Sequence, residues 1–129
     1  MIHILIVAKH AEVREGLCTV LQLSSQMIIM GAAGGLVDAL EQASTTSPNV
    51  VIIDLEMPGG EGYEILSQLK SHFPQIKSLA LTAHDYPSTW QRAAQAGASG
   101  MIVKGLDWQE MVATILRLAL PHAPEGSET

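Results

Sequence analysis

Short runs of apolar residues alternate along the chain with longer stretches whose apolar positions recur every three to four residues. The short runs predict strands buried on both faces, because such strands carry few polar positions. The longer stretches predict helices with one buried face. This alternation is typical of repeated βα units around a parallel sheet, so the predicted fold class is α/β. The expected strands are residues 2–8, 27–32, 50–54, 78–82 and 100–104.

The helical pattern predicts five helices between and after these strands. Gly97 suits the left-handed backbone that ends a helix, so it marks the end of the fourth. Asp107 and Glu110 have the spacing of a capping box that opens the last helix, which ends before Pro121. The other helices are expected at residues 12–23, 36–43, 61–72 and 88–96.

Composition limits the protein to one domain and excludes some functions. With 129 residues and 47% hydrophobic content, the chain fits a single core at residues 1–120 and a polar, mobile tail or truncated linker at 121–129. The net charge of −6 is opposite to that of a surface that binds nucleic acid directly. A single cysteine, Cys18, excludes an internal disulfide, and no apolar run approaches a membrane span. We therefore expect a cytoplasmic protein.

The residues that end the predicted strands are chemically unusual. In open parallel sheets, ligands and chemistry collect outside the carboxyl ends of the strands. Here these ends carry Ala8 and Lys9, then Asp54, Thr82 and Lys104. A carboxylate, a hydroxyl and two ammonium groups are thus predicted to meet at one edge of the sheet.

These residues and their motifs resemble the receiver domain of bacterial response regulators, most closely the NarL-type transcription factors. "VVIIDLEMPGGEGYEIL" resembles the phosphoacceptor strand and loop with Asp54 as acceptor, "LALTAH" the strand that carries the hydroxyl of Thr82, and "AGASGMIVKG" the strand that carries Lys104. "VREGL" fits the first helix. The resemblance implies a flavodoxin-like (CheY-like), doubly wound sheet of five parallel strands in the order 2-1-3-4-5, with five helices.

The resemblance also implies phosphoryl transfer from a histidine kinase to Asp54 with help from magnesium. The acidic pair that normally holds magnesium is replaced by Ala8 and Lys9. We therefore expect magnesium binding to be lost or very weak, with no other cofactor. We predict that Lys9 pairs with Asp54 instead, with Lys104 on the other side. The alternative is that Lys9 extends to solvent or pairs with Glu12.

Three further positions bear on the site. Met101 stands where the family has an aromatic switch residue, so coupling from Thr82 to the fourth and fifth helices should be weakened or changed. Met101 can at the same time fill a gap in the core. Glu56 is interpreted as an exposed loop residue rather than a substitute magnesium ligand. His84, at the edge of the site, is interpreted as a solvated loop histidine rather than a proton carrier.

The expected function is signalling rather than catalysis: an atypical receiver of a two-component phosphorelay that acts by protein contacts. A DNA-binding domain outside this chain would control transcription, and the partners are a histidine kinase or another signalling protein. A weak homodimer is expected through the first and fifth helices, or through the fourth helix, fifth strand and fifth helix, where Trp108 lies. One alternative is a haloacid-dehalogenase-like phosphatase with Asp54 as nucleophile. A flavodoxin-like cofactor binder lacks support, because no phosphate cradle follows the first strand.

Overall fold

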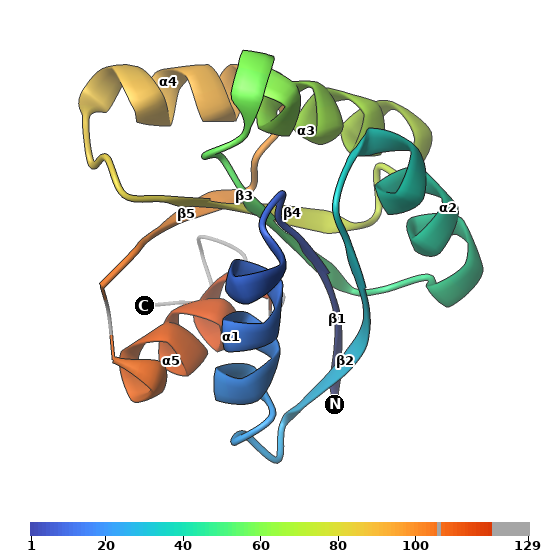
Figure 1. The fold of residues 1–129 in the computed structure, drawn as a ribbon, viewed down its shortest axis with the longest axis vertical. Coiled ribbons are helices and arrows are strands. Elements are labelled where there is room, and N and C mark those ends of the chain that lie inside the picture. Colours follow the sequence, from blue (N-terminus) through green and yellow to red (C-terminus); the bar gives the residue numbers. More distant parts are fainter. Residues whose placement is uncertain (106, 120–129) are drawn as a thin grey trace, which may run out of the picture.

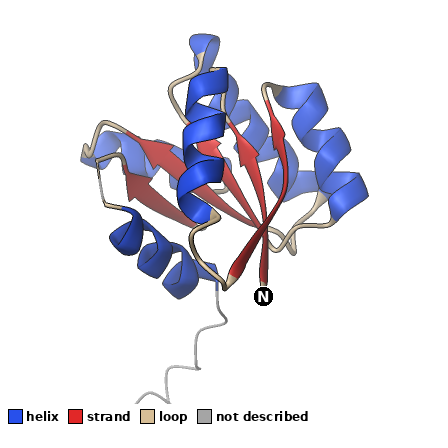
Figure 2. Cartoon of the chain, turned by 60° about the horizontal axis from the view of Figure 1, so that its bottom comes forward, coloured by secondary structure: helices blue, strands red, loops and turns tan. Residues whose placement is uncertain are grey.

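A parallel sheet of five strands forms the centre of the molecule. The computed structural model describes residues 1–105 and 107–119, and the predicted tail at 121–129 lies outside them. The sheet order is β2-β1-β3-β4-β5. Every neighbouring pair is parallel, and the strand arrows in Figure 2 run in one direction. This confirms the predicted fold class and strand order. The strands are β1 (Ile2–Val7), β2 (Met27–Ala33), β3 (Val50–Asp54), β4 (Lys77–Thr82) and β5 (Gly100–Val103).

Helices cover both faces of this sheet. Two of them, α1 (Ala11–Leu21) and α5 (Trp108–Ala119), lie on one face (Figure 1). The other face carries α2 (Leu36–Thr46), α3 (Glu61–His72) and α4 (Pro87–Ala96). None of the described helices is long and apolar enough to cross a membrane.

Successive residues of the central strands belong to two different apolar clusters. In β3, Val50 and Ile52 pack with helices α1 and α5, whereas Val51 and Ile53 pack toward α2, α3 and α4. All four are essentially inaccessible to solvent. Burial on both faces explains why the sequence of these strands is continuously apolar.

Three glycines shape the connection from β3 to α3. A short 3-10 turn, η1 (Pro58–Gly60), begins at a proline, and both Gly59 (φ 69°) and Gly60 (φ 72°) adopt left-handed conformations. Gly62 lies so close to the end of β3 that a Cβ there would lie 3.1 Å from the backbone oxygen of Asp54. The loop thereby brings the first turn of α3 against the carboxyl end of β3.

The predicted ends lie within two residues of the observed ends, except at the end of α2. It continues to Thr46 rather than to residue 43, and then ends at Ser47, whose backbone is left-handed (φ 46°). The fourth helix does end at Gly97 in a left-handed conformation (φ 117°). At the start of α5, the Asp107 side chain accepts a hydrogen bond from the Glu110 N–H at 2.8 Å, as the capping motif predicts.

Candidate functional site

Asp54 is the buried carboxylate at the carboxyl end of β3. Only 1% of its surface is exposed. Its Oδ1 accepts a hydrogen bond from the Glu56 N–H at 3.0 Å. The Lys104 ammonium lies 3.0 Å from Oδ1 and 3.2 Å from Oδ2, so it contacts both carboxylate oxygens. A buried carboxylate is stable only when it is paired and hydrogen-bonded, and these contacts meet that need.

The sheet register brings Lys104 to this carboxylate. Asp54 pairs with Leu81 across the neighbouring strand. One residue later, the backbone oxygen of Thr82 accepts a hydrogen bond from the Lys104 N–H at 2.7 Å. Lys104 therefore follows β5 directly beside the end of β4, and its side chain reaches Asp54 across that strand.

Lys9 does not take the position that we predicted. Its side chain is exposed, and no ion pair joins it to Asp54 among the described residues. The prediction of a direct Lys9–Asp54 pair is therefore wrong, and the alternative of an ammonium group in solvent is correct. The physical reason is that Lys104 already neutralises the carboxylate, so a second ammonium would lose its hydration for little electrostatic gain.

A cation that the sequence analysis did not single out lies at the end of β1. The Arg14 guanidinium donates to the backbone oxygens of Ala8 (2.8 Å) and Lys9 (3.1 Å). Arg14 belongs to α1, so this contact fixes the start of that helix against the strand end. The "VREGL" motif contains Arg14, but nothing in the sequence indicates that its partners are backbone carbonyl groups.

Glu56 is more constrained than the exposed loop residue that we predicted. Its side chain is 33% exposed, and Oε1 lies 3.6 Å from the Lys104 ammonium. The same oxygen accepts a hydrogen bond from the Ala83 N–H at 2.8 Å. Glu56 is a loop residue, as predicted, but the predicted exposure is wrong, because the partly buried side chain connects the β3–α3 and β4–α4 loops. Lys104 lies between the carboxylates of Asp54 and Glu56.

The hydroxyl group of Thr82 is buried and hydrogen-bonded within its own loop. It accepts from the His84 N–H at 3.0 Å, and it lies 3.4 Å from the His84 carbonyl oxygen. Among the described residues, no hydrogen bond links it to Asp54. The His84 side chain is exposed, as predicted, and its ring stacks on Tyr86 with centroids 5.7 Å apart.

Met101 is part of the core between the sheet and the helices of the α2–α4 face. It is 6% exposed, which agrees with the expectation that it fills a gap. A pocket of about 130 Å³ lies beside it, at the junction of α4 and β5. This pocket is lined by Trp90, Ala94, Ala98, Ser99, Gly100 and Met101.

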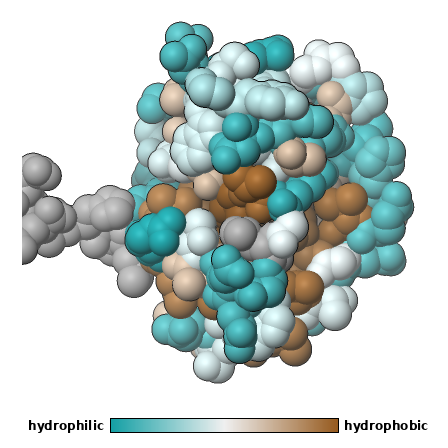
Figure 3. Space-filling view, turned by 90° about the vertical axis from the view of Figure 1, so that its left-hand side faces the viewer, coloured by the Kyte–Doolittle hydropathy of each residue, from teal (hydrophilic) through white to brown (hydrophobic). Residues whose placement is uncertain are grey.

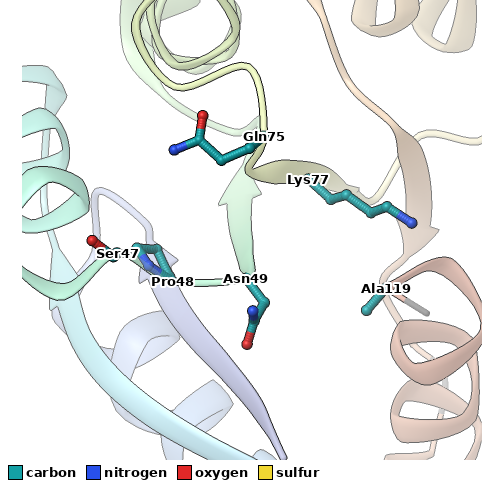
Figure 4. A pocket seen from close by; sticks show the side chains of 6 residues that line it. All are labelled: Ser47, Pro48, Asn49, Gln75, Lys77 and Ala119. Carbon is teal, nitrogen blue, oxygen red and sulfur yellow. The ribbon is translucent and has the colours of Figure 1, made fainter. Parts of the chain in front are cut away.

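Another pocket, of about 270 Å³, lies far from this chemistry (Figure 4). It opens at the amino ends of β3 and β4, opposite to the end that carries Asp54 and Thr82. The Lys77 ammonium beside it donates to the backbone oxygen of Leu118 at 3.1 Å. The pocket is lined by Ser47, Pro48, Asn49, Gln75, Lys77 and Ala119.

A buried aspartate ends β3, a hydroxyl ends β4 and a lysine follows β5, and the whole sequence was compared with known protein families. Residues 4–116 match the response regulator receiver domain. The chain belongs to the receiver domain family. The match covers most of the chain, and it argues against the alternative of a haloacid-dehalogenase-like phosphatase.

Individual receiver proteins agree with this assignment. The DNA-binding transcriptional activator DevR/DosR of Mycobacterium tuberculosis is 30% identical over 115 residues, which is 89% of this chain and 53% of that protein. The response regulator GacA of Pseudomonas viridiflava is 35% identical over 115 residues, 89% of this chain and 54% of GacA. The signal receiver domain of NarL from M. tuberculosis superposes with a TM-score of 0.83 at 30% identity, covering 92% of this chain and 95% of that structure. The chain thus spans about half the length of the curated relatives it matches.

The contact of Glu61 near the site, like that of Arg14, was not predictable from residue types. The Glu61 carboxylate, in the first turn of α3, accepts a hydrogen bond from the Leu36 N–H at 2.9 Å. It thereby caps α2, whose N-cap residue Gly35 has no side chain to do so. The loops that surround Asp54 in the receiver domain are therefore connected to one another by side-chain contacts with backbone groups.

Proposed function

We propose that the chain is an atypical receiver domain whose output does not require magnesium-dependent phosphorylation of Asp54. The observation that carries the proposal is the absence of a carboxylate at the end of β1, where Ala8 and Lys9 stand beside a buried Asp54 that contacts the Lys104 ammonium through both oxygens. The two preceding strand-end positions, Ala8 and Lys9, provide no carboxylate. The charge compensation that a metal ion would supply is provided by a side chain of the protein.

The donor set does not fit magnesium. This ion requires near-octahedral oxygen coordination and is usually held by one or two carboxylates together with water and phosphate. The carboxylates of Asp54 and Glu56 at this edge of the sheet both lie within ion-pair distance of the Lys104 ammonium. Among the described residues, no group of three or more His, Cys, Asp and Glu side chains is arranged to hold a metal. A dication beside Asp54 would find no carboxylate at Ala8 or Lys9, and the positive charge of Lys9 would repel it.

We propose that the domain signals through protein contacts, with a histidine kinase or another signalling protein as partner. Control of transcription would reside in a DNA-binding domain outside this chain. Two observations support this view: the chain spans about half of its curated relatives, and DevR/DosR is a DNA-binding transcriptional activator. Direct DNA binding by this domain itself is not expected, because its net charge is −6.

A weak homodimer is part of this proposal. Figure 3 shows apolar side chains gathered in the middle of the face that α4, β5 and α5 form (Figure 3). Trp90 on α4 (42% exposed) and Trp108 on α5 (39% exposed) belong to these elements. Large exposed aromatic side chains are enriched at protein interfaces, so this surface fits a second copy of the chain that associates without a phosphodonor.

The proposal is tested by exposing the protein to acetyl phosphate with and without millimolar magnesium and measuring its intact mass. We expect no magnesium-dependent labelling of Asp54. The variant Ala8→Asp, Lys9→Asp is the positive control, because it restores the acidic pair while Asp54, Thr82 and Lys104 stay in place. The variant should bind magnesium more tightly than the wild type in calorimetry. Stoichiometric, magnesium-dependent phosphorylation of the wild type at Asp54 would refute the proposal.

A further inference from the structure

The carboxylate of Glu56 accepts a hydrogen bond from the Ala83 N–H and lies within ion-pair distance of the Lys104 ammonium. We infer that Glu56 is a built-in anion that holds the β4–α4 loop closed on the β3–α3 loop, whether or not Asp54 is modified. The inference rests on the proposed function, because it gives the atypical receiver a fixed loop conformation without phosphorylation. It adds a regulatory contact that no residue type in the sequence indicates.

One carboxylate contacts the segments that follow β4 and β5, through a hydrogen bond to the first and an ion pair with the second. Oε1 of Glu56 accepts the Ala83 N–H at 2.8 Å and lies 3.6 Å from the Lys104 ammonium. The backbone N–H of Glu56 donates to Asp54 at 3.0 Å, so the Glu56 backbone is itself held at the site. A hydrogen bond from a neutral N–H group to an ionised carboxylate is stronger than one between two neutral groups. With two-thirds of its side chain buried, Glu56 is positioned to restrain the loop.

The restrained loop leads directly into α4. Ala83 follows β4, and the hydroxyl of Thr82 closes a tight turn with the N–H of His84. Asp85, two residues before the helix begins, accepts a hydrogen bond from the Trp90 indole N–H at 2.7 Å. The position of Ala83 is therefore connected, through short-range hydrogen bonds, to the first turns of α4.

The same carboxylate competes with any anion added at Asp54. A new negative group on Asp54 would need the Lys104 ammonium and nearby N–H donors for compensation. Glu56 already uses the Ala83 N–H and shares Lys104, and its own charge repels a second anion. A negative group on Asp54 would thus gain little electrostatic stabilisation, and the β4–α4 loop would keep its present conformation.

The test is hydrogen exchange of the Ala83 amide, followed by NMR in the whole 129-residue chain without a phosphodonor. In Glu56→Ala the acceptor is removed, so we expect exchange at Ala83 to accelerate roughly tenfold or more. Glu56→Gln keeps an acceptor oxygen but loses the charge, so its acceleration should be smaller, about threefold. Glu41→Gln is the matched control, because Glu41 is exposed on α2 and removal of its charge should leave Ala83 unchanged.

Amides of the central strands, such as Ile52 and Leu79, report on global stability in the same spectra. The inference is overturned if Ala83 exchanges in Glu56→Ala within twofold of the wild type. It is also overturned if the acceleration is uniform over the strands, or if Glu41→Gln causes it as well. These outcomes are distinct from failure of the proposed function, which would appear as magnesium-dependent labelling of the wild type whatever the exchange rate of Ala83.

Discussion

The pairing of Asp54 with Lys104 rather than with Lys9 can be measured as a difference between two coupling energies. Double-mutant cycles in urea, Asp54→Asn with Lys104→Met and Asp54→Asn with Lys9→Met, remove each potential pair in turn. Both lysines become methionine, which keeps a long flexible side chain without the charge. The two cycles are therefore matched controls for each other.

The structure sets the expected magnitude of the Lys104 coupling. At the 3.0 Å separation between its Nζ and Asp54 Oδ1, two unit charges attract by roughly 5.5 kcal/mol at an effective dielectric constant of 20 and by roughly 1.4 kcal/mol in water. The Lys104 side chain is 31% exposed, so solvent screens the pair, and burial of Asp54 carries a desolvation cost. We expect a coupling free energy of about 1–2 kcal/mol for this pair.

The Lys9 coupling should be below about 0.5 kcal/mol, because its exposed side chain makes no ion pair with Asp54. Urea unfolding of the wild type, the three single variants and the two double variants gives both values. A Lys104 coupling below half a kcal/mol would refute the assignment of the ion pair. So would a Lys9 coupling as large as that of Lys104, which would mean that Lys9 also contacts the carboxylate in solution.

Two further predictions concern backbone strain and association. Gly97→Ala should destabilise the fold by about 1–3 kcal/mol in urea unfolding, because φ is 117° and the new Cβ would lie 2.8 Å from Lys70 Cδ. Gly16→Ala should instead stabilise the fold by about 0.5–1 kcal/mol, because Gly16 lies in helix α1 with open space around it. Equal effects of the two substitutions would contradict this reasoning. In sedimentation equilibrium the average mass of the wild type should rise with concentration, and Trp108→Gln should reduce that rise; a strict monomer at several hundred micromolar would rule out the dimer.

Strand positions were predictable from the sequence because burial on both faces leaves continuous apolar runs. The predicted strand at 50–54 matches β3, and the others differ by one residue at one end. Helix ends were predictable where a residue has a specific backbone preference, as at Gly97. The end of α2 was not, because Ser47 adopts a left-handed conformation that its residue type does not favour.

The candidate site was only partly predictable, because some of its side chains contact backbone groups rather than other side chains. Strand order and register determine that Asp54, Thr82 and Lys104 share one edge, and the sequence reveals all three as strand ends. The contacts of Glu56 and Arg14 are made with backbone N–H and carbonyl groups. Nearly every residue has a backbone N–H and carbonyl group, so the sequence does not indicate which of these groups a side chain will contact.

The failed prediction for Lys9 shows what distinguishes this receiver domain physically. One buried carboxylate needs one close cation, and Lys104 is delivered to it by the register of β5 on β4. Once Asp54 is neutralised, a second ammonium gains little by leaving water, so Lys9 stays exposed. Lys9 then repels a dication from a distance through its positive charge, and its ammonium group does not occupy the position of the metal ion. The response to magnesium should therefore depend more on the loss of two carboxylate ligands than on the positive charge of Lys9. The variant Ala8→Asp, Lys9→Asp, which restores both acids, tests this conclusion.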